Sequence, residues 1–190
     1  MPKVIALMLA AGRGSRFGSD KRIARLADGR SLLAASVAQA QQVFSQVHVL
    51  LRVEDDSQAL GLAADCRLLR CAEADQGMGH SLAAGIRALA GQDADAIAVL
   101  LGDMPWISTN SLQQLCEQAA PERIVYPLCE GRRGHPVLFG RAFWPQLLNL
   151  TGDQGARELL QAHAAVCHPI VLDDAGVLRD VDRPEALLAR

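Results

Sequence analysis

The stretch Val4-Ile-Ala-Leu-Met-Leu9 is a continuous apolar run that leads into the glycine-rich sequence Ala10-Ala-Gly-Arg-Gly-Ser-Arg-Phe-Gly-Ser-Asp-Lys21. A continuous rather than alternating apolar run is typical of a strand buried on both faces of a parallel sheet. Similar runs recur at residues 47–51, 96–101, 124–126 and 166–172. Between them the sequence predicts covering helices at residues 31–43, 82–89, 112–119 and 156–165. This alternation predicts a three-layer α/β sandwich around a mostly parallel sheet.

The length and composition point to one domain spanning residues 1–190, without internal repeats or linkers. Hydrophobic residues make up 50% of the chain and charged residues 21%, which is enough apolar material for a core. With 19 Lys+Arg against 21 Asp+Glu, the formal charge is -2. The chain lacks the basic surplus that would bind nucleic acid or an anionic membrane, so we expect neither partner. Any bound anion is expected to be small.

The cysteines form no C-x-x-C pair, which predicts neither a disulfide framework nor a zinc ribbon. Free thiols are typical of a reducing compartment. The apolar run near the start is too short for a signal peptide, and no stretch approaches the roughly 20 apolar residues of a membrane span. We therefore expect a cytoplasmic protein without a membrane segment.

Three glycines and three cations follow the first predicted strand. The glycines allow the backbone to curl so that successive N–H groups converge on an anion, and the cations add positive charge. Their G-x-G-x-x-x-G spacing fits neither the dinucleotide-binding nor the P-loop pattern. An ordinary flexible turn is the alternative, although it would leave adjacent like charges to repel one another. The residues concerned are Gly12, Gly14, Gly18, Arg13, Arg16 and Lys21.

The run Leu-Ala-Ala-Gly-x-Gly-x-Arg-Phe-Gly-x-Asp-Lys resembles the signature of the molybdenum-cofactor nucleotidylyltransferases, especially the cytidylyltransferase branch and related MobA-like transferases. The resemblance implies a Rossmann-like fold of the nucleotide-diphospho-sugar-transferase type. It also implies a loop that wraps the triphosphate of a nucleotide, with Arg16 and Lys21 on the phosphates. The nucleotide-binding residues that it implies here are Leu9, Ala10, Ala11, Gly12, Gly14, Arg16 and Lys21.

Two acidic blocks are candidates for a metal site. In Leu101-Gly-Asp-Met-Pro105, Asp103 ends a predicted strand, where a carboxylate can hold Mg²⁺ or cap the following helix. Family members bind Mg²⁺ through this aspartate. Asp180-Val-Asp-Arg-Pro184 resembles the closing Asp-Ile-Asp-Thr-Pro segment of the family, although Arg183 replaces the threonine. This implies Asp182, or else Asp180, as a second metal ligand, while a helix that starts at the proline is the alternative.

Gln76-Gly-Met-Gly-His-Ser-Leu82 predicts a turn and a helix that begins near His80 or Ser81, with Ser81 as a good N-cap. The run is similar to the Gly-Met-Gly-x-Ser-Leu of the family, which lines the base and ribose of the nucleotide. By this resemblance Gly79 and Ser81 bind nucleotide. His80 stands at the variable position and receives no role.

Two further segments resemble the acceptor side of the family. Gly131-Arg-Arg-Gly-His-Pro-Val-Leu-Phe139 could clamp a phosphorylated acceptor or form a solvated basic hairpin tip. Gly152-Asp-Gln-Gly-Ala-Arg157 could hold a loop and a phosphate, or form a surface salt bridge within itself. The acceptor-binding residues that the resemblance implies are Gly134, His135, Pro136, Asp153 and Arg157.

The resemblance implies transfer of CMP from CTP to the phosphate of molybdopterin, with release of pyrophosphate and with Mg²⁺ as cofactor. Arg16, Lys21 and Asp103 are the implied catalytic residues, with Asp103 and Asp182 on the metal. Ala11 favours CTP, because the guanylyl branch has glycine there, although GTP and other phosphorylated acceptors stay open. A non-catalytic factor that delivers cofactor to a molybdenum hydroxylase is another alternative. The acidic pair favours an enzyme, and a molybdenum hydroxylase is its candidate partner.

Overall fold

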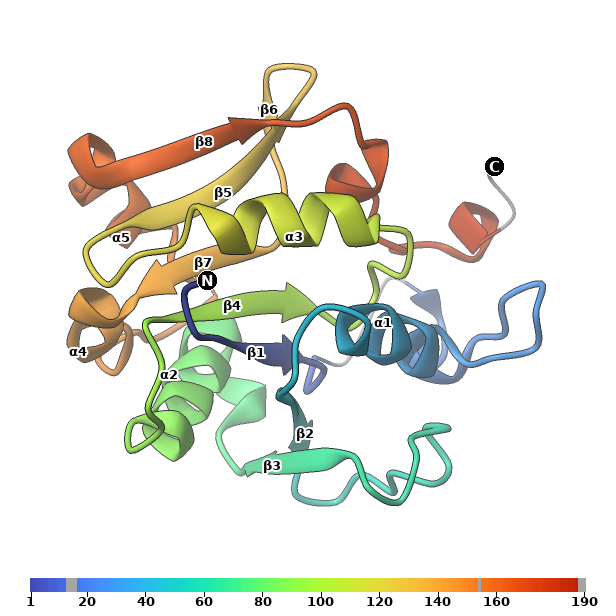
Figure 1. The fold of residues 1–190 in the computed structure, drawn as a ribbon. Coiled ribbons are helices and arrows are strands. Elements are labelled where there is room, and N and C mark those ends of the chain that lie inside the picture. Colours follow the sequence, from blue (N-terminus) through green and yellow to red (C-terminus); the bar gives the residue numbers. More distant parts are fainter. Residues whose placement is uncertain (13–16, 154, 188–190) are drawn as a thin grey trace.

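The computed structural model describes residues 1–12, 17–153 and 155–187, and its centre is one mixed sheet. The strand order is β3-β2-β1-β4-β7-β5-β6 (Figure 1). β8 lies outside this order and pairs with β5 in parallel. The strands are β1 (Val4–Leu9), β2 (Val47–Arg52), β3 (Arg67–Cys71), β4 (Ala96–Leu101), β5 (Ile124–Cys129), β6 (Arg132–Arg133), β7 (Val137–Gly140) and β8 (Cys167–Val171). β1 lies parallel between β2 and β4, and Ile5 to Met8 are at most 2% exposed. The predicted burial of this strand on both faces is confirmed.

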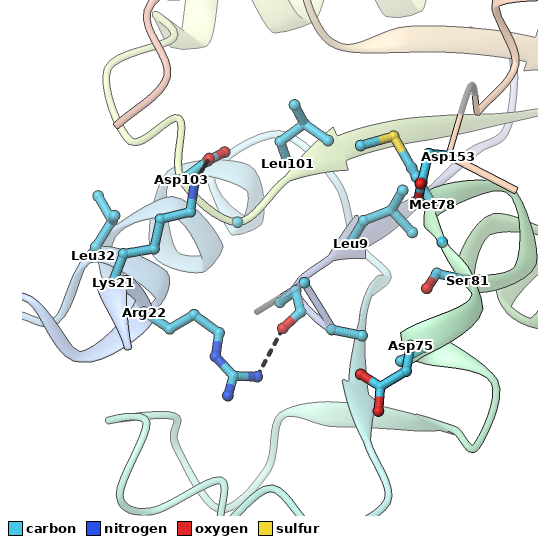
Figure 2. A pocket seen from close by; sticks show the side chains of 16 residues that line it. Leu9, Lys21, Arg22, Leu32, Asp75, Met78, Ser81, Leu101, Asp103 and Asp153 are labelled. Atoms are coloured by element: carbon cyan, nitrogen blue, oxygen red, sulfur yellow. Dashed lines mark hydrogen bonds and ion pairs between the residues drawn. The ribbon is translucent and has the colours of Figure 1, made fainter. Parts of the chain in front are cut away.

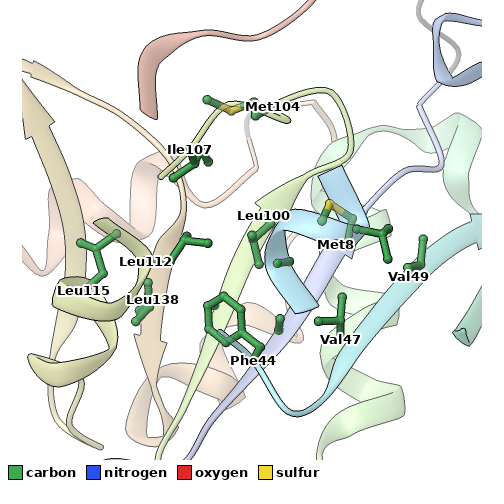
Figure 3. Packing of buried hydrophobic residues seen from close by; sticks show 14 of the residues in the cluster. Met8, Phe44, Val47, Val49, Leu100, Met104, Ile107, Leu112, Leu115 and Leu138 are labelled. Carbon is green, nitrogen blue, oxygen red and sulfur yellow. The ribbon is translucent and has the colours of Figure 1, made fainter. Parts of the chain in front are cut away.

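Helices cover both faces of the sheet. The α-helices are α1 (Leu32–Gln41), α2 (Met78–Leu89), α3 (Thr109–Glu117), α4 (Trp144–Leu147) and α5 (Arg157–Ala162). α1 and α3 pack on one face, where Leu33 of α1 belongs to the same apolar cluster as Met8 and Leu100. Leu112 of α3 lies in this cluster as well (Figure 3). α2, α4 and α5 contribute to the cluster that contains Ile5 and Leu7 on the other face. The predicted three-layer α/β sandwich is confirmed.

Several local features differ from the sequence-based expectation. The edge strand β3 was not expected, because its sequence Arg-Leu-Leu-Arg-Cys has only a two-residue apolar centre between arginines. β7 lies antiparallel between β4 and β5, so the sheet is parallel from β3 to β4 and mixed beyond it.

Among the helices of the described segments, none has the length and apolar character of a membrane span.

The start of α2 was predicted wrongly. Gly77, with a φ of 114°, precedes the helix, which begins at Met78 rather than near His80 or Ser81. Ser81 is therefore a buried helical residue and not the N-cap. Asp103 does not cap the next helix either, because Ser108 is the N-cap of α3 and accepts a hydrogen bond from Ser111 N.

Candidate active site

A cavity of about 480 Å³ opens at the carboxyl ends of β1 and β4 (Figure 2). Ligands of such sheets bind at this edge, because the loops that follow parallel strands meet there. Most of the predicted nucleotide-binding residues that the structure describes line this cavity. They are Leu9, Ala10, Ala11, Gly12, Lys21 and Ser81, together with the predicted metal ligand Asp103 and the predicted acceptor residue Asp153. Arg13, Gly14 and Arg16 lie outside the described residues.

Lys21 points toward Asp103 (Figure 2). It also contacts Asp182, and so joins the two acidic blocks. It begins the 3₁₀ helix η2 (Lys21–Ile23), which Asp20 caps. Lys21 Nζ lies 2.5 Å from Asp103 Oδ2 and 3.4 Å from Asp182 Oδ1, and it also donates to Val181 O at 3.1 Å. Burial opposes its charge, yet the carboxylates of Asp103 and Asp182 raise the pKa of Lys21. Lys21 is therefore a fixed ammonium at the mouth of the cavity.

The acidic blocks meet although they are far apart in sequence. Val181 N donates to Asp103 O at 3.1 Å, which holds the second block beside the first. One carboxylate oxygen each from Asp103, Asp180 and Asp182 lies within 4.8 Å of the others. Burial and the neighbouring Asp182 raise the pKa of Asp180. These hard oxygen donors fit Mg²⁺ or Mn²⁺, and the ammonium of Lys21 already lies among them as a positive charge.

Gly79 does not line the cavity, in contrast to its predicted nucleotide contact. A Cβ at this position would lie 2.5 Å from Thr151 O, and Gly79 N donates to Gly152 O at 2.7 Å. His80, which the sequence left without a role, accepts at Nδ1 from Gly152 N at 3.1 Å. The start of α2 therefore packs closely against the loop that carries Asp153.

A second cavity of about 260 Å³ adjoins the first, since Leu9, Met78 and Leu101 line both. The predicted acceptor residues Gly134, His135 and Arg157 line the second cavity, together with Arg133 and apolar side chains. Pro136 is not among its lining residues. Asp153 lies instead on the first cavity, among the nucleotide-binding candidates.

The arginines and the histidine of the acceptor segment are in different environments. Arg132 and Arg133 are exposed on β6, which forms a hairpin with β5, and Arg133 also lines the second cavity. His135 is half-buried, and its buried Nδ1 has no hydrogen-bond partner among the described residues. Burial lowers the pKa of His135. Gly134 is required by packing, because a Cβ there would lie 2.3 Å from Val177 O.

Some lining residues of the first cavity had not been singled out in the sequence. They include Arg22, Asp75, Gly77 and Met78. Gly77 could have been found from the sequence, because it is the first glycine of the Gln76–Leu82 motif. Arg22 directly follows Lys21, but its role depends on partners that are remote in sequence.

Gly12 after a buried strand, Lys21 and a cluster of carboxylates at this edge of an α/β sheet are the kind of groups that a nucleotidyltransferase site contains. Residues 6–166 match the family model described as MobA-like NTP transferase domain. The chain therefore belongs to the MobA-like NTP transferase family, and the family resemblance of its motifs is confirmed.

Relatives match over nearly the whole chain. Purine catabolism protein PucB of Bacillus subtilis (strain 168) is 31% identical, over 97% of this chain and 94% of its own length. Nicotine blue oxidoreductase of Paenarthrobacter nicotinovorans is 28% identical, over 98% of this chain and 96% of its own length. The structure of Rv0371C from Mycobacterium tuberculosis H37Rv in complex with manganese has a TM-score of 0.78 at 22% identity. The match covers 97% of this chain and 95% of that chain. The structural likeness confirms the fold.

Proposed function

We propose that the protein transfers CMP from CTP to the phosphate of molybdopterin, as a cytoplasmic enzyme whose residues 1–190 form one nucleotidylyltransferase domain. An acceptor phosphate oxygen attacks the α-phosphorus of CTP. The bond from the α-phosphorus to its bridging oxygen breaks, and pyrophosphate leaves with the bonding electrons. Such transfer depends on positioning and on neutralising charge rather than on a protein nucleophile.

The observation that carries this proposal is the position of Lys21, between the acidic blocks and beside the strand end Leu9–Gly12. Its ammonium lies 2.5 Å from Asp103 at the wall of the first cavity, where a triphosphate bound to the glycine turn would extend. A lysine there can neutralise charge that develops on the phosphates. Arg16, outside the described residues, is proposed for the same role.

Asp103 and Asp182, with Asp180 beside them, would hold a divalent cation. Mg²⁺ bound there would neutralise phosphate charge and orient the leaving pyrophosphate. A protein with this fold has been solved in complex with manganese, which supports a divalent cation as the cofactor.

The two cavities support a two-substrate reaction. The first suits the nucleotide, and Ala11, 2% exposed, places a methyl group in its wall, which favours a pyrimidine over the larger guanine. The second has apolar walls with Arg133, His135 and Arg157, a combination that suits a flat heterocycle carrying a phosphate. A molybdenum hydroxylase that receives the product is the proposed partner.

The test is pyrophosphate release by the purified protein with Mg²⁺ and each of CTP, GTP, ATP and UTP, with and without molybdenum-loaded molybdopterin. We expect release that depends on the acceptor and on CTP, and its loss in Asp103→Asn. Release from GTP would contradict the base preference, while the reaction type would stand. Silence with all four nucleotides despite CTP binding would contradict molybdopterin transfer and favour another acceptor or a delivery role.

A further inference from the structure

Arg22 lines the nucleotide cavity, yet its guanidinium is fully engaged by the protein. The side chain is 7% exposed. Nη1 donates to Ala10 O at 2.8 Å and to Asp55 at 2.5 Å, and Nη2 donates to Asp55 at 2.7 Å and to Asp20 at 2.8 Å. Nε donates to Asp20 at 2.9 Å. A guanidinium has five N–H donors, and these bonds use all of them, so Arg22 has none left for a phosphate.

A second arginine makes the equivalent contact one residue further along the chain. Arg52, at the end of β2, donates from Nε to Ala11 O at 2.8 Å. Its backbone N donates to Asp55 Oδ2 at 2.9 Å. Asp55 therefore binds both arginines, and its side chain is only 7% exposed. Burial opposes its charge, but Arg22 and Arg52 lower the pKa of Asp55, which keeps it an anion.

These contacts fix two consecutive peptide planes at the start of the glycine turn. In a trans peptide the C=O of one residue and the N–H of the next point to opposite sides. Because Arg22 holds Ala10 O, the N–H of Ala11 points away from Arg22. Because Arg52 holds Ala11 O, the N–H of Gly12 points away from Arg52. Two successive N–H groups oriented together form an anion-binding concavity.

We propose that Arg22 and Arg52, joined through Asp55, are positioning residues that aim the N–H groups of Ala11 and Gly12 at the bound nucleotide. This inference rests on the proposed function, in which the turn holds CTP. It separates two adjacent residues by role: Lys21 acts on the substrate, and Arg22 acts only through the backbone. Buried ion pairs contribute little net stability over apolar packing, whereas they can fix one conformation, which is the task assigned to this one.

Arg22→Gln, Arg52→Gln and Asp55→Asn test the inference through the dissociation constant of CTP, measured by calorimetry with Mg²⁺. Each variant loses charge-assisted bonds that hold the turn, so we expect CTP binding to weaken by roughly tenfold to a hundredfold. The KM of the acceptor should change little in the same variants. Arg30→Gln is the matched control, because Arg30 forms a 2.5 Å ion pair with Asp28 on the exposed surface, and it should bind CTP as the wild type does.

Thermal unfolding of each variant separates positioning from folding, since binding is measured well below the melting temperature. A folded Arg22→Gln with the wild-type CTP affinity would overturn the inference. If Arg22→Gln does not fold, Arg52→Gln and Asp55→Asn decide the question in the same way. A wild type that binds none of the four nucleotides contradicts the proposed function and this inference together, whereas equal binding by wild type and variants contradicts the inference alone.

Discussion

At the scale of single residues, the ammonium of Lys21 stabilises the close approach of the two acidic blocks. Asp103 and Asp182 would repel one another across the short distance that separates them, and the ammonium between them reduces that cost. A divalent cation that binds the same oxygens must compete with Lys21. A triphosphate would give the ammonium another set of oxygens, which links metal binding to nucleotide binding.

Lys21→Met should therefore have two opposite effects. Pyrophosphate release should fall by roughly two orders of magnitude or more, because a fixed charge on the phosphates is lost. Binding of Mn²⁺ without nucleotide, followed by electron paramagnetic resonance, should tighten by about an order of magnitude because the competing cation is gone. Lys3→Met removes the 2.8 Å ion pair of Lys3 with Asp93 at the other end of β1 and should change neither quantity. Unchanged Mn²⁺ affinity in Lys21→Met would show that Lys21 and the metal do not compete.

At the scale of elements, the start of α2 and the loop that follows α4 form one packed junction. A Cβ on Gly77 would lie 2.5 Å from Gly152 O, and one on Gly79 would lie 2.5 Å from Thr151 O. His80 adds a hydrogen bond from Gly152 N. This junction puts Met78 on the boundary of both cavities and brings Asp153 to the first of them.

Gly79→Ala should lower the free energy of unfolding by about 1–3 kcal/mol, because backbone atoms must move to admit the new methyl group. Helix propensity alone would favour alanine by about 1 kcal/mol, so the sign of the effect reports the clash. Urea denaturation measures it. Gly91→Ala is the control, since a Cβ there meets nothing within 4 Å, and its effect should stay within about 0.5 kcal/mol. A stabilised Gly79→Ala would mean that the junction opens without cost.

At the scale of the whole molecule, two apolar clusters on opposite faces of the sheet stabilise the fold. His48 on β2 and His135 beside the second cavity each have one buried ring nitrogen that lacks a partner among the described residues. Burial, with a smaller effect of Arg67, lowers the pKa of His48, and burial lowers that of His135. Both therefore take up a proton less readily than an exposed histidine does.

Stability should therefore fall as the pH is lowered from 7 to 5. Below about pH 6.5 the unfolded chain binds protons that the folded histidines do not bind, so acid favours unfolding. Each such histidine contributes up to about 1.4 kcal/mol per pH unit. His48→Gln should reduce this slope in denaturant titrations, whereas His168→Gln, on the exposed face of β8, should not. An unchanged slope in His48→Gln would contradict a neutral buried His48.

Much of this architecture was predictable because its causes are local. Strands β1 and β4 are continuous apolar runs, and β2 is an apolar run interrupted by His48. The helices that cover them carry apolar stripes at helical spacing. The motifs at residues 9–21, 101–105 and 180–184 indicated the family and the charged residues of the candidate site, because each is a specific short sequence. Ser31 and Ser108 likewise cap α1 and α3 through contacts within three residues.

The layered α/β fold, the family and the charged groups of the candidate site follow from the amino-acid sequence, because each depends on patterns of neighbouring residues. The tertiary structure alone decided that β3 forms an edge, that β7 runs antiparallel and that α2 starts at Met78. It also decided that Lys21 contacts Asp103 and Asp182, and that Asp55 joins two arginines on one turn. These features depend on burial and hydrogen bonding between segments that are tens of residues apart, and no local pattern encodes such contacts.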